Sequence, residues 1–255
     1  MKIGSKEPVR IVTDNTDAIK VYQGADLVWT AREGKIYYVA ANGSDSNSGL
    51  RREEPWQTLN KVNSFTFDPG DSILFKRGDS WIGQLKPQGG GTASNPILLS
   101  AYSDGAHPYI NGNGAEFFTA ETAEGVIHLV NQSYWIIDGF EVTSWSNTES
   151  YRYGILVKST NASTTGVTIR NNFVHDVMGG RVATNAFIND ITVEGRNTGG
   201  IVVSAPQGGF NDICIENNTL ERIVGVGIYV YGPKEYIEDS SSSESFSFES
   251  SSESM

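Results

Sequence analysis

A short pattern of glycine and apolar residues recurs along the middle of this 255-residue chain. One set of segments reads Gly-Ile-x-Val, at 154–157, 200–203 and 227–230. A second set ends in Asn-Asn, one further residue and an apolar residue, at 166–174 and 212–220. The segment 135–142 fits the same frame, with Asp-Gly in place of Asn-Asn. Units this short cannot bury a core alone, so they must stack on one another. Stacked units of three short strands predict an all-β protein, a parallel β-helix.

The side-chain alternation of a strand divides each repeat into two faces. It points Ile169 and Ile215 into the coil and Arg170 and Glu216 outward. The Asn pairs fall at the bend that follows, where Asn tolerates a left-handed backbone and can hydrogen-bond its own turn. We therefore assign a structural role to Asn171, Asn172, Asn217 and Asn218.

The same alignment places charged residues of neighbouring coils opposite one another. Arg170 falls opposite Glu216, His175 opposite Glu221, and Asp176 opposite Arg222. Pairs at neighbouring strand positions contribute a few tenths of a kcal/mol each, about 0.2–1. This interpretation makes His175 and Asp176 structural residues rather than catalytic ones.

Unequal repeat spacing indicates insertions at one corner of the stack. Gly154 and Gly200 are 46 residues apart, whereas Gly200 and Gly227 are 27 apart. We interpret the excess as a long insertion over about 179–198, beside a shorter one at 143–153. The alternative is two 23-residue coils with an extra strand at 191–193.

Loops that project from a rigid scaffold often carry binding sites. Sugar rings stack on aromatic faces, and their hydroxyls need polar partners. The insertions therefore predict a carbohydrate-binding flank; alternatively, their aromatic residues only pack the loops onto the coils. The aromatic residues in question are Trp145, Tyr151, Tyr153 and Phe187.

The long insertion also holds the candidate catalytic residues. Glycoside hydrolysis needs two carboxyl groups about 5–10 Å apart, which Asp190 and Glu194 could supply. A lyase needs a base and a cation that stabilises a developing negative charge, and Arg181 and Arg196 are available. We predict no cofactor and no metal site, with a calcium ion at the turn Asp45–Gly49 as the alternative. The turn Asp45–Gly49 resembles half a calcium loop but lacks the bidentate acid further on.

The composition excludes several functions. Acidic residues outnumber basic ones by 30 to 19, which gives a net charge of −11 and a pI of about 4.7. Such a chain has no general attraction to nucleic acid or to an anionic membrane surface. Its single cysteine, Cys214, excludes an internal disulfide framework. We find no secretory signal peptide and no stretch long enough to span a membrane.

Two segments carry a resemblance to β-helix proteins. The stretch 37–62, YYVAANGSDSNSGLRREEPWQTLNKV, resembles the opening of right-handed parallel β-helix proteins, in which Pro-Trp-x-Thr-Leu begins a capping helix, here at 55–63. The stretches 69–78 and 96–102 are similar to the first coils of polysaccharide lyases and related proteins. The resemblance implies a β-helix of about six coils over residues 35–232. It does not fix the chemistry.

The two ends of the chain differ from this body. Residues 1–33 hold short β-like runs at 9–12, 19–22 and 27–29, enough for a small β module. Residues 18–29 resemble short N-terminal segments of bacteriophage virion proteins. Residues 233–255 form an acidic, Ser-rich tail that we expect to be disordered.

Together these resemblances imply a bacteriophage spike or fibre protein located in the virion. It would attach to other virion proteins through residues 1–33 and bind host surface polysaccharide. We expect the open end of the stack, after 229–231, to drive self-association, as a homotrimer, or docking onto another virion protein. The alternatives are a polysaccharide-degrading enzyme, a lyase or glycoside hydrolase, and a purely architectural head or tail decoration.

Overall fold

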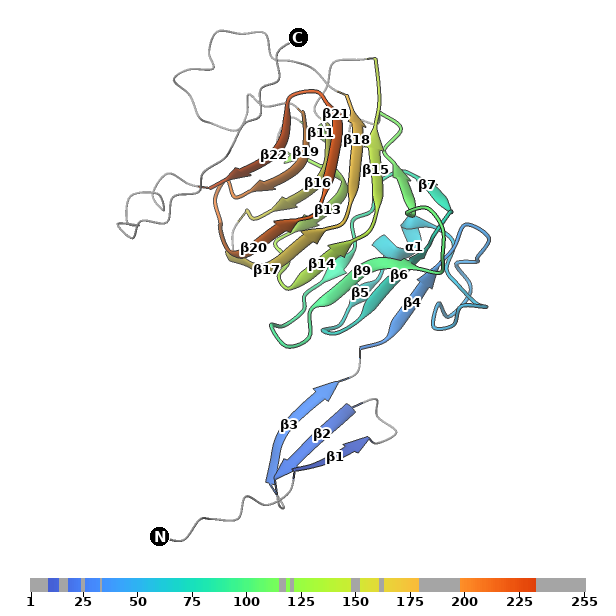
Figure 1. Ribbon diagram of the computed structural model, residues 1–255, viewed down its shortest axis with the longest axis vertical. Coiled ribbons are helices and arrows are strands. Elements are labelled where there is room, and N and C mark those ends of the chain that lie inside the picture. The colour runs from blue at the N-terminus through green and yellow to red at the C-terminus, as the bar shows by residue number, and fades with distance from the viewer. Residues whose placement is uncertain are drawn as a thin grey trace, which may run out of the picture.

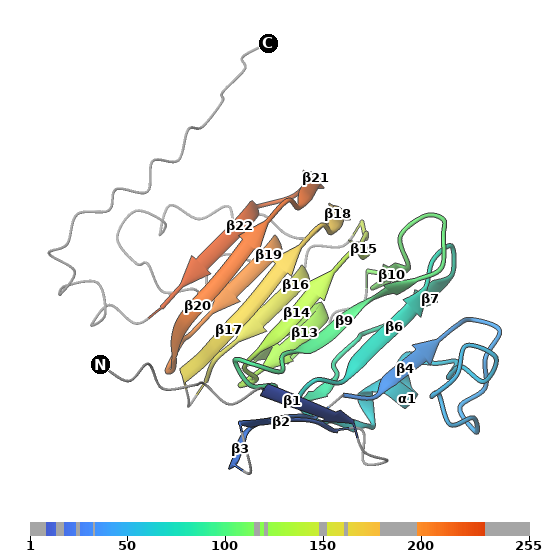
Figure 2. The ribbon, with the colours of Figure 1, turned by 60° about the horizontal axis from the view of Figure 1, so that its bottom comes forward.

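The computed structural model of the chain is an all-β, right-handed parallel β-helix (Figures 1 and 2). The structure describes residues 9–13, 18–23, 26–32, 34–114, 118–119, 122–147, 152–160, 163–178 and 198–232. Within this described part, no helix has the length and apolar character that a membrane span requires.

Three parallel sheets form the sides of the coil. The six-stranded sheet contains β4 (Ile36–Val39), β6 (Ser72–Lys76), β9 (Ile97–Tyr102), β14 (Trp135–Asp138), β17 (Ser163–Arg170) and β20 (Gly209–Glu216). The five-stranded sheet contains β7 (Ser80–Ile82), β10 (Tyr109–Asn111), β15 (Glu141–Ser144), β18 (Phe173–Val177) and β21 (Thr219–Ile223). The four-stranded sheet contains β13 (Gly125–Val130), β16 (Arg152–Lys158), β19 (Thr198–Ser204) and β22 (Val226–Tyr231). Figure 2 shows the strands of the six-stranded sheet side by side, from β4 to β20.

The register confirms the repeat that the sequence predicts. Ile155 pairs with Ile201, which pairs with Ile228, so the three Gly-Ile-x-Val segments are neighbours. Because β16 pairs directly with β19, the 46-residue interval is one coil with an insertion, and the alternative of two 23-residue coils is wrong.

A continuous apolar core fills the coil. Inward side chains such as Ile73, Leu99, Ile137 and Ile169 are fully buried. Burying one such side chain stabilises the fold by roughly 1.5–3 kcal/mol relative to leaving it exposed. The core therefore holds the stack together and presents the alternate side chains of every strand on its outer surface.

The N-terminal end of the stack is closed by a short helix. The sequence predicts this helix at 55–63, but α1 spans only Leu59–Asn63. Thr58 is its N-cap and accepts a hydrogen bond from the Lys61 backbone N–H. Trp56 lies before the helix because it bridges Val39 and stacks on the Tyr37 ring at 4.9 Å. Leu59 and Val62 bury the apolar face of α1.

At the other end of the stack, β22 is the last strand among the described residues, and it exposes apolar side chains. Ile228 is 46% exposed and Val230 is 59% exposed, whereas their neighbours one coil earlier, Ile201 and Val203, are fully buried. The difference shows how much a following coil hides. Self-association at this end, including the homotrimer, stays a prediction.

The smaller sheets complete the described structure. Residues 1–33 contain a three-stranded antiparallel sheet, formed by β1 (Val9–Thr13), β2 (Ala18–Gln23) and β3 (Asp26–Arg32). Two further pairs are β5 (Thr66–Phe67) with β8 (Gln88–Gly89), and β11 (Phe118–Thr119) with β12 (Thr122–Ala123). The expected acidic tail, 233–255, lies outside the described residues.

Candidate functional site

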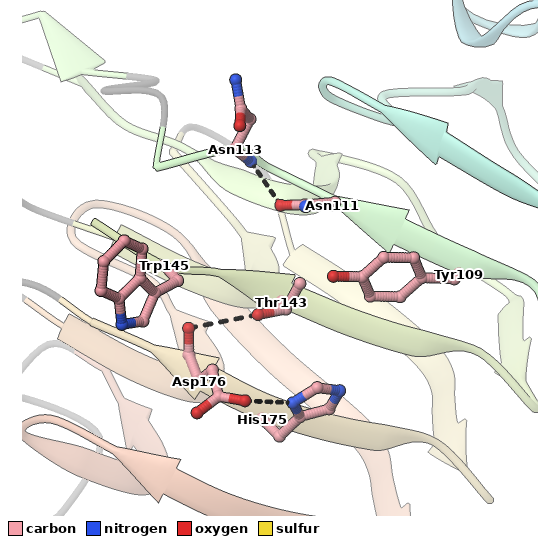
Figure 3. Close-up of a pocket in the computed structure, with 7 residues that line it drawn as sticks. All are labelled: Tyr109, Asn111, Asn113, Thr143, Trp145, His175 and Asp176. Carbon is pink, nitrogen blue, oxygen red and sulfur yellow. Dashed lines mark hydrogen bonds and ion pairs between the residues drawn. The ribbon is translucent and has the colours of Figure 1, made fainter.

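A groove of about 380 Å³ lies on the outer face of the five-stranded sheet (Figure 3). Three successive strands build it, β10, β15 and β18. Their inward residues, Ile110, Val142 and Val174, are fully buried in the core. The alternate residues therefore face outward. The groove is lined by Tyr109, Asn111, Asn113, Thr143, Trp145, His175 and Asp176.

Two rows of side chains cross the strands at this groove. Asn111, Thr143 and His175 occupy one row, in register from coil to coil. Tyr109, Glu141 and Phe173 occupy the adjacent row. Neighbouring strands lie about 4.8 Å apart, so each row is a ladder of groups fixed by the backbone. Side chains from residues more than sixty positions apart in sequence are thereby held together.

His175 bridges two carboxylates beside the groove. Its Nδ1 lies 2.6 Å from Asp176 Oδ2, and its Nε2 lies 3.1 Å from Glu141 Oε1. The imidazole ring and its two hydrogen bonds separate the two carboxylate oxygens. They are therefore at most about 8 Å apart, within the range in which glycoside hydrolases hold their catalytic carboxyl pair.

Arg222 on β21 fixes Asp176 in its ionised form. Its Nε donates to Asp176 Oδ1 at 2.6 Å and its Nη2 donates to Oδ2 at 2.7 Å. These bonds, followed by the one with His175, hold the pKa of Asp176 well below its usual range. Arg222 also donates to Glu221 Oε2 at 2.9 Å. The ion pair of Asp176 with Arg222 that the alignment predicts is present.

A bulge in β18 sets the direction of the Asp176 side chain. The register of β15 and β18 shifts between Thr143 and Ser144, and Asp176 takes a left-handed backbone with φ of 48°. Bulges bend a strand and redirect its side chains. The Thr143 hydroxyl donates to the Asp176 carbonyl oxygen at 3.2 Å across this irregularity. The bulge thus places the Asp176 carboxylate beside the residues of β15.

Tyr109 contributes a hydroxyl that remains protonated. Burial first, and then the charges of Glu141 and Asp176, raise the pKa of the Tyr109 phenol. Figure 3 shows its hydroxyl directed toward the middle of the groove. A neutral phenol can donate a hydrogen bond to a ligand oxygen.

The structure separates the two predicted aromatic residues that it describes. Trp145 follows β15 at the edge of the groove and is 53% exposed, so one ring is accessible to a ligand. Tyr153, which we expected on the same exposed flank, is buried at 6% exposure on β16, in a cluster with Leu156 and Val202. The expectation fails there because the insertion ends earlier than the sequence suggests, and β16 already begins at Arg152.

The remaining predicted residues lie outside the described residues. These are Tyr151, Arg181, Phe187, Asp190, Glu194 and Arg196. The described residues before the two insertions end beside the groove, at Asn147 and at Met178. Buried Arg152 links the ends of two strand segments at this corner. Its Nε donates to the Gly114 carbonyl at 3.1 Å, and its Nη1 donates to the Met178 carbonyl at 3.0 Å.

Asp45, in the turn that resembles a calcium loop, binds the chain just before α1. Its Oδ1 accepts hydrogen bonds from the backbone N–H groups of Gln57 and Thr58, both at 2.9 Å, and its Oδ2 accepts from the Thr58 hydroxyl at 2.6 Å. A calcium ion would have to displace these donors. Among the residues that the structure describes, no three His, Cys, Asp or Glu side chains are grouped to hold a metal.

The Asn pairs lie at the corner after the six-stranded sheet. Asn171 and Asn217 have left-handed backbones, with φ of 55° and 54°. Asn172 and Asn218 turn inward and form a ladder between coils. Asn172 donates from its Nδ2 to Asn218 Oδ1 at 3.0 Å and accepts from the Phe140 N–H at 3.0 Å.

Sequence reasoning missed Tyr109, Asn111, Asn113 and Thr143 in the groove lining and Glu141 beside it. The coil that holds the first three lacks the Gly-Ile-x-Val and Asn-Asn segments, so it could not be aligned with the later coils. Glu141, however, lies in the segment 135–142, which was aligned. Its place opposite Phe173, two residues before His175, could have been read from that frame.

The class of protein that the fold and groove define is a parallel β-helix with a polar and aromatic groove across its coils. No family model matches the chain. The lacto-N-biosidase of Bifidobacterium longum subsp. longum is 28% identical to it, over 62% of this chain and 13% of that protein. The crystal structure of a GH136 lacto-N-biosidase from Eubacterium ramulus has a TM-score of 0.65 and 23% identity. It covers 81% of this chain and 38% of that one, and its native form gives a TM-score of 0.64.

These likenesses support the fold and point to carbohydrate chemistry for the relatives. The chain spans 13% of the length of the curated relative and 38% of the solved structure. Neither relative is a virion protein by its name, so the resemblance of residues 18–29 to phage proteins stays a prediction.

Proposed function

We propose that this chain is a carbohydrate-active β-helix protein that binds a neutral glycan in the groove of β10, β15 and β18 and hydrolyses a glycosidic bond there. The observation that carries the proposal is the combination of one exposed indole, several hydroxyl and amide groups, and two carboxylates bridged by His175. Sugars need this combination, since their ring faces are apolar and their edges are polar.

The charges favour a hydrolase over a lyase. Glu141, Asp176 and Glu221 place three carboxylates around the groove, and the guanidinium of Arg222 already binds two of them. A uronate substrate brings another negative charge, and a lyase needs a cation to neutralise it. A neutral sugar avoids this repulsion. Hydrolysis needs two carboxyl groups, which Asp176 in the groove lining and Glu141 beside it would supply.

The two carboxyl groups would have different tasks. Asp176 stays ionised, which suits a group that faces the positive charge of an oxocarbenium-like transition state. Glu141 is bound on one oxygen by His175 and would supply the proton for the leaving oxygen. Water would then add to the anomeric carbon, and its proton would return to Glu141. Asp190 and Glu194 are the alternative pair, because their insertion begins directly after Met178 at the same corner.

A hydrolysis assay tests this proposal. The purified chain is incubated with a chromogenic lacto-N-bioside, chosen because of the relatives' names, and with neutral and acidic bacterial polysaccharides. Release of reducing ends from a neutral glycan supports the proposal, whereas unsaturated uronate products would make the chain a lyase. Binding without products would support the spike-type receptor role. The absence of both binding and products would favour an architectural protein.

Matched variants then locate the catalytic groups. We expect Glu141→Gln to lower kcat by about 10²–10⁴-fold. Asp138→Asn is the control, since Asp138 also carries an ion pair, with Arg170 at 2.9 Å, but on the six-stranded sheet. Loss of activity in Asp190→Asn or Glu194→Gln, with Glu141→Gln unchanged, would move the reaction to the insertion.

A further inference from the structure

His128 is a buried side chain on the four-stranded sheet, and among the residues that the structure describes neither of its ring nitrogens has a hydrogen-bond partner. It lies in β13 between Ile127 and Leu129, which are fully buried in the core. Strand alternation therefore points His128 out of the coil. It is nevertheless only 2% exposed. A buried polar group without partners is rare in native structures and suggests a missing ligand or ion.

The charges of three side chains, Lys86, Glu124 and Lys158, act on this imidazole. Lys86 Nζ lies 2.7 Å from Glu124 Oε1, and Gln84 Nε2 donates to the other oxygen of Glu124 at 3.0 Å. Lys158, at the end of β16, is half-buried, and its charge acts on His128 together with those of Lys86 and Glu124. Lys86 pairs with Glu124 and Lys158 adds a second ammonium group whose charge interacts with theirs, so the group of three has one positive charge in excess.

The pKa shifts of His128 and Lys158 are consistent with an excess of positive charge. Burial and then the Lys86 charge lower the pKa of His128 to about 3, so the ring is neutral at ordinary pH. Burial is also the main cause that lowers the pKa of Lys158. Both shifts would be reduced by a negative group placed between the lysines. The neutral ring retains one N–H that can donate to such a group.

We infer that Lys86, Lys158 and His128 form a binding site for a single oxyanion, a carboxylate or sulfate group. The two ammonium groups supply the attraction, and the His128 N–H donates a hydrogen bond from the sheet. The site lies on the four-stranded sheet, whereas the groove lies on the five-stranded sheet. It therefore does not depend on the proposed hydrolysis.

Nuclear magnetic resonance of the imidazole nitrogens tests the inference at neutral pH, with His128→Gln to assign the signal. The probes are sodium sulfate and sodium glucuronate, compared with sodium chloride at equal ionic strength and with glucose. We expect saturable shifts of the His128 nitrogens with one or both oxyanions and none with the controls. Tighter binding of glucuronate would identify an acidic sugar as the source, and tighter binding of sulfate a free inorganic anion.

A matched pair of lysine variants completes the test. Lys158→Gln should weaken oxyanion binding by at least about tenfold, because it removes one of the two attracting charges. Lys76→Gln, on β6 of the six-stranded sheet, should leave it unchanged. The inference is overturned if His128 does not respond to either oxyanion, or if both lysine variants have the same effect.

Discussion

Asp176 and Arg222 occupy equivalent positions in adjacent coils, share a left-handed backbone and bind each other through two hydrogen bonds. Their φ angles are 48° and 50°. On either side of them, His175 pairs with Glu221 and Val177 with Ile223. The same bulge is therefore repeated in two coils, and the ion pair joins the two copies. It fixes the carboxylate at the groove in one position.

We expect Arg222→Gln to lower the free energy of unfolding at neutral pH. The difference in this free energy between the variant and the wild type should become smaller in acid. The pKa of Asp176 is lower in the folded protein than in the unfolded chain, so its contribution is present above the ordinary Asp pKa of about 3.9. It is lost progressively as the pH falls from that value towards the lower pKa of the folded protein, because the unfolded chain takes up the proton first. Urea unfolding between neutral pH and about pH 2 measures this narrowing.

The control for this prediction is Asp176→Asn, which removes the titrating group. Arg222→Gln should have little further effect on stability in that background. A stability difference that stays constant down to about pH 2 would show that Arg222 acts through packing and not through the charge of Asp176.

Trp145→Ala should weaken glycan binding about tenfold, which corresponds to about 1.4 kcal/mol, with little change in Tm. The ring is 53% exposed, so its loss leaves the core intact and removes only a surface on which a sugar can stack. Isothermal titration calorimetry measures the affinity. Leu50→Ala is the control, because Leu50 is 47% exposed and lies outside the groove. Equal affinities of Trp145→Ala and wild type would exclude the stacking role.

The fold could be predicted from the sequence because each coil repeats a pattern with a simple physical basis. The alternation of side chains along each strand determines which residues point inward. Asn172 and Asn218 mark the bend after the six-stranded sheet. Register then follows, since Ile169 pairs with Ile215 as aligned. Ion pairs were predicted less well. Arg170 lies opposite Glu216, yet its Nε binds Asp138 in the preceding coil at 2.9 Å.

The site was harder to predict, because it depends on departures from the repeat. A bulge moves Asp176 to the groove, and nothing in its local sequence distinguishes it from an ordinary strand residue. Tyr109 comes from a coil without the repeat signature. Trp145 and Tyr153 were both predicted to be exposed from their place in the shorter insertion. Trp145 is exposed, but the reasoning failed for Tyr153, where the strand had already begun.

We expect Asn172→Ala to destabilise the fold by about 2–3 kcal/mol, because it leaves buried polar partners unsatisfied. Asn172 is 1% exposed, and its Nδ2 also donates to the Ile137 carbonyl at 3.2 Å. Urea unfolding measures the loss. Asn171→Gly is the control, since glycine adopts the left-handed backbone of Asn171 at little cost. Similar losses for both variants would show that the bend, and not the ladder, needs Asn.

The exposure of the last described coil predicts unequal effects of one substitution in two adjacent coils. Ile201→Ala should cost about 2–5 kcal/mol, as a buried Ile does, because Ile201 is fully enclosed. Ile228, its neighbour in the last described coil, is 46% exposed, so Ile228→Ala should cost much less in dilute solution. If copies associate through this end, the cost of Ile228→Ala should rise with protein concentration. Unfolding at two concentrations, with sedimentation to report the oligomeric state, measures both. A small cost at every concentration, with a single monomeric species, would contradict self-association.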